Sequence, residues 1–478
     1  MQTMSSSSSP LNTGAPAAAP IWLIPLVVAS ALFMENMDST VIATSLPAIA
    51  DDLGEDPVIL KLAFTAYLLS LAVFIPVSGW CADRFGARRI FQAAILVFCA
   101  ASIGCAMAGD LTELVAARTL QGIGGAMMVP VGRLILLRSV PKKDLVRALA
   151  WLTMPALVAP VVGPLIGGFI TTYFHWRWIF WINIPFGVLA IVLARAYMPA
   201  SQNFEIRPMD WRGFFLSGLG FVGLIAGASV MGRDFLPGWA APGMMAAGAG
   251  FLWLYVLHAR HAAAPMLDLA LFRIATFRQS VLGGSFFRVA VGAIPFLLPL
   301  LLQVGFGLNP FQSGAITFAA AAGALAMKIT AQPILRQFGF RSVLTVNGLI
   351  CAAFFFGYAL FTPETAHWLI FIILVAGGFF RSLQFTSLNA LAYSDVDEKQ
   401  MSQATGIVSV GQQVALSGGV ALAGLVLEGA RQWRGDAVLT AADFGPAFAA
   451  VAAFSVVAAF IHMRLAPDAG AEVSGHRP

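Results

Sequence analysis

The composition of the chain excludes a water-soluble protein. Of its 478 residues, 59% are hydrophobic and only 11% are charged, whereas soluble domains carry about 25% charged residues. The mean hydropathy of +0.82 also indicates a protein that lies in a membrane. The net charge of +5 is better explained by basic cytoplasmic loops than by binding to nucleic acid. The cysteines have the spacing of neither a zinc site nor a disulfide framework.

Long apolar segments follow an uncharged start. Residues 1–19 are rich in Ser, Ala and Pro, and we expect them to form a disordered tail. A helix needs about 20 apolar residues to cross a bilayer, and about fourteen segments meet this requirement. They are 21–46, 58–80, 89–109, 113–137, 147–171, 177–198, 212–231, 240–258, 277–303, 311–332, 341–361, 367–390, 403–427 and 444–464. His258, His261 and His367 fall at segment ends or in loops, where contact with water is expected.

The loops between these segments alternate in charge. Arg84, Arg88 and Arg89 follow the second segment, whereas Asp51 and Asp52 follow the first. Cytoplasmic loops of membrane proteins carry the excess of basic residues. The alternation therefore predicts that both termini lie in the cytoplasm.

A short repeat divides the chain. Asp83-Arg-Phe-Gly-Ala-Arg88 follows the second segment, and Arg336-Gln-Phe-Gly-Phe-Arg341 follows the tenth. Internal repeats are typical of transporters, which bind substrate between the repeated halves. The predicted units are a tail at 1–19, a six-helix bundle at 20–200, two further helices at 201–260, a second six-helix bundle at 261–465 and a cytoplasmic tail at 466–478.

The first apolar segment carries two acids, Glu35 and Asp38, which lie on nearly the same face of a helix. Ionisable groups inside a membrane are costly and are usually functional. At about 1.5 Å of rise per residue, Asp38 and Arg118 of the fourth segment lie at similar depth. This pair is either a proton-coupling pair or a structural ion pair, and Gln121 is a polar neighbour of Arg118.

Several motifs resemble those of the major facilitator superfamily. The loop Gly79-Trp-Cys-Ala-Asp-Arg-Phe-Gly-Ala-Arg-Arg89 is similar to the superfamily's loop between its second and third helices. Arg118-Thr-Leu-Gln-Gly-Ile-Gly-Gly125 resembles the motif with a buried arginine in the fourth helix. Gly163-Pro-Leu-Ile-Gly-Gly168 resembles the motif of antiporters. Met37 to Pro47 and His175 to Gly187 are similar to signatures of the fourteen-helix drug:proton antiporter branch, which includes multidrug exporters of the HsrA and EmrB type.

The resemblance implies an all-α integral membrane protein with two six-helix bundles and two extra central helices, 14 transmembrane helices in all. It implies a conformational latch formed by residues of the first loop and an antiporter motif in the fifth helix. The latch residues are Gly79, Asp83, Arg84, Gly86 and Arg88, and the motif residues are Gly163, Pro164, Gly167 and Gly168.

The same resemblance implies a function. The expected activity is proton-coupled export of small lipophilic or amphiphilic compounds by alternating access, with Asp38, Glu35 and Arg118 in proton coupling. No P-loop is present, so an enzyme is not expected and a proton gradient, without a cofactor, is the expected energy source. The expected location is the bacterial inner membrane, and a separate periplasmic adaptor and outer-membrane channel are candidate partners. The alternatives are a dedicated carrier of one metabolite class, such as an anion, and a receptor that does not transport.

The second half carries cations at membrane depth. By helical rise, Arg288 and Arg381 lie roughly 16 and 14 Å above the cytoplasmic edge, and Lys328 lies about 8 Å above it. The two arginines either bind an anionic or zwitterionic substrate or pair with Gln384, Asn389 or Gln303 to stabilise the bundle. The expected substrate cavity contains Glu35, Asp38, Arg118, Gln121, Arg288, Arg381 and Gln384.

Overall fold

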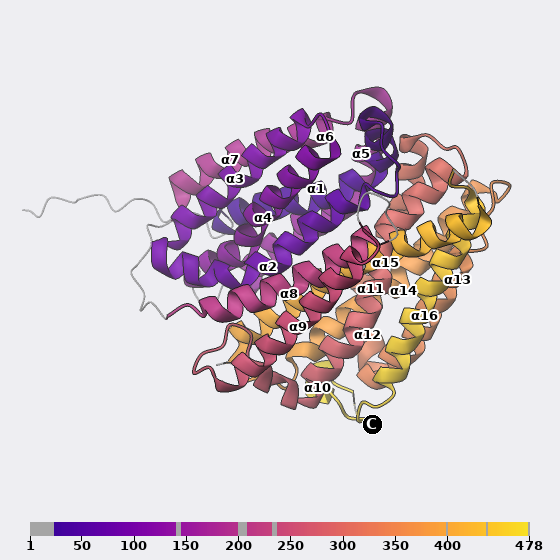
Figure 1. Ribbon diagram of the computed structural model, residues 1–478. Helices are drawn as coiled ribbons and strands as arrows, with labels where there is room; N and C mark the ends of the chain where they lie inside the picture. The colour runs from indigo at the N-terminus through magenta and orange to yellow at the C-terminus, as the bar shows by residue number, and fades with distance from the viewer. Residues whose placement is uncertain are drawn as a thin grey trace, which may run out of the picture.

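A computed structural model describes residues 23–139, 145–198, 208–231, 237–397, 400–435 and 438–476. In these ranges the chain is helical and contains no strand, which confirms the predicted all-α class (Figure 1). The tail predicted at residues 1–19 lies outside the described residues.

The first half and the two helices after it run from residue 23 to residue 261. The elements are α1 (Leu23–Leu53), α2 (Lys61–Phe85), α3 (Ala87–Met107), α4 (Leu111–Ser139), α5 (Leu145–Tyr173), α6 (Trp178–Trp181), α7 (Asn183–Tyr197), α8 (Trp211–Val230) and α9 (Ala240–His261).

The second half contains α-helices, three π-helical segments (η3, η4 and η5) and one short 3-10 helix (η2). The elements are η2 (Leu269–Arg273), α10 (Ala275–Arg278), η3 (Gln279–Gly283), α11 (Gly284–Leu300), η4 (Leu301–Gly305), α12 (Pro310–Ser342), η5 (Val343–Asn347), α13 (Gly348–Tyr358), α14 (His367–Tyr393), α15 (Met401–Arg434), α16 (Ala441–His462) and α17 (Ala471–Ser474). The short helix α17 packs against α12, so part of the predicted tail at 466–478 is docked on the bundle.

Helices occupy the described part of each predicted apolar range, but length and composition give fewer membrane spans than the fourteen predicted. Twelve of the described helical segments are long and apolar enough to cross a membrane. Residues 330–358, at the end of α12 and through α13, form one of these spans, although the sequence predicts a break there. The total of fourteen therefore stays a prediction.

The two copies of the sequence repeat share a backbone feature. Gly86 between α2 and α3 has φ 92°, and Gly339 near the end of α12 has φ 69°. Side chains other than that of glycine rarely adopt this left-handed region. Each glycine therefore allows one helix to follow the other with almost no loop, at the same place in each half.

The two halves meet at one end of the molecule. Gln303 Nε2 donates to the Thr44 carbonyl oxygen at 2.9 Å, and the Phe311 N–H donates to Thr172 Oγ1 at 2.9 Å. Arg431 forms an ion pair with Asp56 at the same end. We call the region of these contacts the closed end. It is built from the C-terminal parts of α1, α5, η4 and α15 and from the start of α12.

Helix α8 lies along the seam between the halves (Figure 1). It packs on α2 of the first half, where the rings of Phe74 and Phe214 are 5.7 Å apart. It also packs on α15 of the second half, where Gly418 faces Ile225. Helix α8 therefore contacts both bundles.

Asp210 holds the start of α8 in place. Its carboxylate accepts hydrogen bonds from the Gly213 N–H at 2.9 Å and the Met266 N–H at 3.1 Å, and His258 Nε2 lies 2.7 Å from Oδ1. His258 lies at the end of α9 as expected, and its side chain, partly exposed, also contacts Asp210 because α8 and α9 form a hairpin. Partial burial opposes ionisation of Asp210, but these hydrogen bonds outweigh it and lower the pKa of the carboxyl.

We expect Asp210→Ala to lower the free energy of unfolding by about 1–3 kcal/mol, because it removes an N-cap and leaves two backbone donors unpaired. A depressed pKa in the folded state stabilises the protein above the pKa of the unfolded carboxyl, about 3.9, and this stabilisation is lost as the pH falls. Thermal unfolding of the purified protein at pH 7 and at about pH 2.5, below the pKa of the unfolded carboxyl, measures both effects. Asp210→Asn is the control, since asparagine keeps the cap without the charge; a stability equal to that of Asp210→Ala would contradict the capping role.

Candidate functional site

Asp38 of α1 forms a buried ion pair with Arg118 of α4. Arg118 Nη1 lies 2.5 Å from Asp38 Oδ2, and the exposed fractions of the two residues are 0% and 3%. The predicted meeting of these two residues at one depth is confirmed. A buried pair of opposite charges is far less costly than either charge alone.

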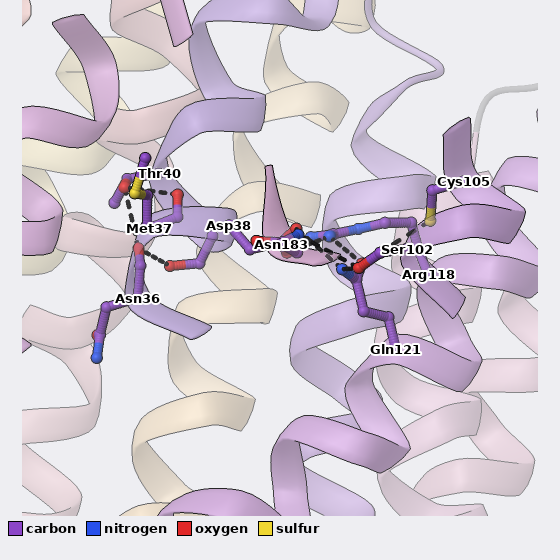
Figure 2. A network of polar contacts seen from close by, with 10 residues as sticks. Asn36, Met37, Asp38, Thr40, Ser102, Cys105, Arg118, Gln121 and Asn183 are labelled. Atoms are coloured by element: carbon purple, nitrogen blue, oxygen red, sulfur yellow. Dashed lines mark hydrogen bonds and ion pairs between the residues drawn. The ribbon is translucent and has the colours of Figure 1, made fainter. Parts of the chain in front are cut away.

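Three neutral side chains complete the site. Gln121 Nε2 and Asn183 Nδ2 both donate to Asp38 Oδ1, at 2.9 and 2.8 Å. The same two amides donate to Ser102 Oγ, at 2.8 and 3.2 Å. Figure 2 shows that Arg118, Gln121, Asn183 and Ser102 gather around the carboxylate of Asp38. We call these five residues the Asp38 network, which joins α1, α3, α4 and α7.

Aromatic rings cover the guanidinium of Arg118. Its central carbon lies 4.3 Å from the centroid of the Tyr67 ring and 6.0 Å from that of Phe180. Nη1 also donates to Gln121 Oε1 at 2.6 Å, but Nε and Nη2 have no hydrogen-bond partner among the described residues. The guanidinium of Arg118 is therefore stabilised by one carboxylate, one amide and an aromatic face. A loss of charge on Asp38 would remove the carboxylate's part of this stabilisation.

Glu35 lies outside this network. Its Oε2 is buried and finds no hydrogen-bond partner in the described part of the chain, and the same is true of the Tyr67 hydroxyl. A Cβ on Gly125 would stand 3.4 Å from that hydroxyl and 3.7 Å from the carboxyl carbon of Glu35. Glu35 and Tyr67 thus present polar atoms near one small residue of α4, beside the ion pair.

The glycines of the predicted antiporter motif are packing surfaces of α5. A Cβ on Gly163 would overlap Thr40 Oγ1, and one on Gly167 would stand 2.6 Å from Thr44 Oγ1. Both contacts are with α1, on the turns that follow Asp38. Gly168 instead faces the Pro310 carbonyl of α12, and the Pro164 carbonyl faces Gly314. The motif therefore joins the helix of Asp38 to the second half.

The predicted latch residues surround the turn at Gly86. Arg88 donates to the carbonyl oxygens of Arg195 at 2.7 Å and Met198 at 2.9 Å, and so caps the end of α7. Gly79 and Arg84 are exposed, and a Cβ on Gly79 would meet nothing within 4 Å. Asp83 is half-buried. The latch role of these residues stays a prediction, and the contact of Arg88 is one that the sequence does not reveal.

Comparison with known proteins identifies the family. The family model described as Major Facilitator Superfamily matches residues 28–420 and 280–478. The chain belongs to the Major Facilitator Superfamily.

Relatives and solved structures agree with this membership. MdtD of Klebsiella pneumoniae subsp. pneumoniae, which is named as a multidrug resistance protein, is 37% identical over 448 residues, covering 93% of this chain and 94% of that protein. MdtD of Salmonella heidelberg is 37% identical over 407 residues, or 84% and 85% of the two chains. The D-xylose-proton symporter has the same fold, with a TM-score of 0.68 at 15% identity over 93% and 97% of the chains. The inward open form of XylE from E. coli gives 0.63 at 14% identity over 93% and 96%.

In this superfamily member the cations of the second half have different surroundings. Arg288 is 1% exposed and donates to Asn389 Oδ1 at 3.0 Å and to the Ser280 carbonyl at 3.3 Å. Lys328 is exposed and donates to Thr386 Oγ1 at 2.9 Å. Arg381 is half-buried and makes no hydrogen bond or ion pair with the described residues.

The two amides that sequence reasoning offered as further partners are engaged elsewhere. Gln384 donates to the Leu344 carbonyl at 2.9 Å and accepts from Asn347 Nδ2 at 2.8 Å, and Gln303 belongs to the closed end. Among the described residues, pairing with a polar neighbour is therefore found for Arg288 and not for Arg381. In this conformation Asp38, Arg118, Gln121, Arg288 and Gln384 are buried against protein groups, so contact of these side chains with substrate stays a prediction.

Asn183 and Ser102 were not predicted as site residues. Asn183 falls in the aromatic stretch His175 to Gly187, whose resemblance to a family signature was the one signal that pointed to it. Ser102 is an ordinary small residue in an apolar segment and gives no signal. Only the packing of α3 and α7 beside α4 brings both to the carboxylate.

Proposed function

We propose that this superfamily member is a proton-coupled antiporter that exports small lipophilic or amphiphilic compounds by alternating access. The Asp38 network carries the proposal, because it places one carboxylate against one arginine inside membrane-spanning helices. The naming of the MdtD relatives for multidrug resistance supports export of drugs. The same naming favours multidrug export over a dedicated metabolite carrier or a receptor.

The coupling step is protonation of Asp38. A proton on this carboxyl removes the charge that holds Arg118 Nη1 at 2.5 Å, and the bonds from Gln121 and Asn183 weaken with it. Binding of a proton and binding of a cation at one site then oppose each other, and this opposition is a reciprocal coupling free energy. Glu35 is the second candidate for proton coupling, and it also offers a carboxylate that selects cationic compounds.

Alternating access follows from the contacts between the halves. Release at the opposite side requires the closed end to separate, which breaks the bonds of Gln303 and Phe311 and the ion pair of Arg431. The antiporter glycines allow α5 to fit closely against both α1 and α12 before that separation. The proposed setting is the bacterial inner membrane with both termini in the cytoplasm, a proton gradient as the energy source and, as partners, a separate periplasmic adaptor and an outer-membrane channel.

The test is a susceptibility panel in an efflux-deficient bacterium that expresses the wild type, Asp38→Asn or Asp51→Asn at matched membrane levels. Asp51 is an exposed carboxylate at the end of α1 and provides the matched control. We expect the wild type and Asp51→Asn to protect against several compounds and Asp38→Asn to protect at least about tenfold less, since one lost charge pair is worth more than 1.4 kcal/mol. Equal protection by Asp38→Asn would remove Asp38 as the coupling acid, and protection against no compound would overturn multidrug export.

A further inference from the structure

The second half concentrates positive charge on one stretch of α14. Arg381 belongs to this stretch, and Phe385 follows it one turn later on the same face. The guanidinium carbon of Arg288 lies 5.6 Å from the Phe385 ring centroid. Lys328 reaches Thr386, the next residue along the helix. Two turns of α14 therefore carry Arg381 and contact two further cations, Arg288 of α11 and Lys328 of α12.

No carboxylate of the described chain balances this group. The described acidic residues of the second half lie in loops or in the first or last two turns of the spanning helices, and Glu364 and Asp395 flank α14 on its two sides. The partners of Arg288 and Lys328 are neutral oxygens. Positive charges at membrane depth without counter-charges are costly and mark functional sites.

Arg381 is the cation that remains available. Arg288 is almost fully buried and uses Nη1 and Nη2 in bonds to protein oxygens. Arg381 is half-buried with no described partner, although a guanidinium has five N–H donors that match a carboxylate or a sulfonate with two parallel bonds. The preceding residues are Phe379 and Phe380, and the Phe380 ring stacks on Phe354 at 5.7 Å. An anionic group bound at Arg381 would therefore have an aromatic surface next to it for an apolar body.

From these contacts we infer an anion-binding subsite in which Arg381 holds the carboxylate or sulfonate of an amphiphilic substrate. This inference rests on the proposed export function and names a substrate class for it. Such a compound carries the counter-charge that the second half lacks, while the two acids of α1 lie in the other half of the molecule.

The experiment uses the full-length protein in proteoliposomes with three fluorescent probes: an anilinonaphthalene sulfonate, ethidium as a cation and Nile red as a neutral compound. Binding is measured without a gradient and transport with an imposed pH gradient. The variants are Arg381→Gln, Arg381→Lys and, as a matched loss of one charge, Arg464→Gln. Arg464 is exposed after α16 and has no described contact with α14.

We expect Arg381→Gln to raise the apparent Kd and KM for the sulfonate at least about tenfold, with changes below about twofold for ethidium and Nile red. Arg381→Lys should recover part of the sulfonate affinity, and Arg464→Gln should behave as the wild type. An unchanged sulfonate affinity in Arg381→Gln, or equal losses for all three probes, would overturn the subsite.

The two proposals fail in different ways. If the wild type transports ethidium or Nile red but neither binds nor transports the sulfonate, the anion subsite is wrong and the export function stands. If the wild type binds the sulfonate through Arg381 but the gradient drives transport of no probe, the subsite stands and the proposed function is wrong.

Discussion

Replacing Arg118 by methionine is expected to lower the free energy of unfolding by about 3–5 kcal/mol, because it leaves the Asp38 carboxylate buried without its counter-charge. Methionine fills much of the same space beside Tyr67 and Phe180, so the loss reports the missing charge more than a cavity. Thermal unfolding of the detergent-solubilised protein measures the effect.

The double variant Arg118→Met with Asp38→Asn separates charge from packing. It removes both charges and keeps the side-chain oxygen that accepts from Gln121 and Asn183, so we expect it to be more stable than Arg118→Met alone. Replacing a buried ion pair as a whole is often close to neutral. A loss in the double variant equal to the sum of the losses in Arg118→Met and Asp38→Asn would show that the two residues do not interact energetically.

A leucine at Gly168 is expected to prevent the close contact of α5 with α12 and to lower transport by at least about tenfold while the protein still folds. A Cβ at this position overlaps the Pro310 carbonyl, which belongs to the backbone and cannot rotate away. At Gly163 a Cβ would instead overlap the Thr40 side chain, whose Oγ1 can rotate away but whose Cβ, 2.9 Å distant, cannot. The conformation with the closed end intact should therefore lose population in Gly168→Leu.

Distance measurements between spin labels on the two sides of the closed end report that population. Gly406→Leu is the control, because Gly406 lies in α15 and a Cβ there meets nothing within 4 Å. The packing argument is wrong if both variants keep wild-type distances and wild-type transport.

Much of the fold follows from hydropathy, because a bilayer requires every spanning segment to be long, apolar and helical. The Asp38–Arg118 pair was also predictable, because opposite charges at one depth in neighbouring helices avoid the cost of unpaired charges in the membrane by pairing. The left-handed glycines follow from the repeat, in which Gly86 and Gly339 occupy the same position.

The rest depends on tertiary contacts. The bond of Arg88 to the end of α7 joins residues 107 positions apart, and that of His258 to Asp210 joins residues 48 positions apart. Neither pairing is signalled by a local sequence pattern. The different surroundings of Arg288 and Arg381 have the same origin. Both are arginines at similar depth, but only Arg288 lies within reach of Asn389.

The bond between Gln303 and the Thr44 carbonyl gives α1 a mechanical role. Thr44 follows Asp38 by six residues on the same helix, which is about 9 Å along its axis. A rigid helix transmits a shift at one point to every other point. In the proposed mechanism, protonation of the acid on α1 would shift the whole helix and so move its contact with the opposite half without a relay of side chains.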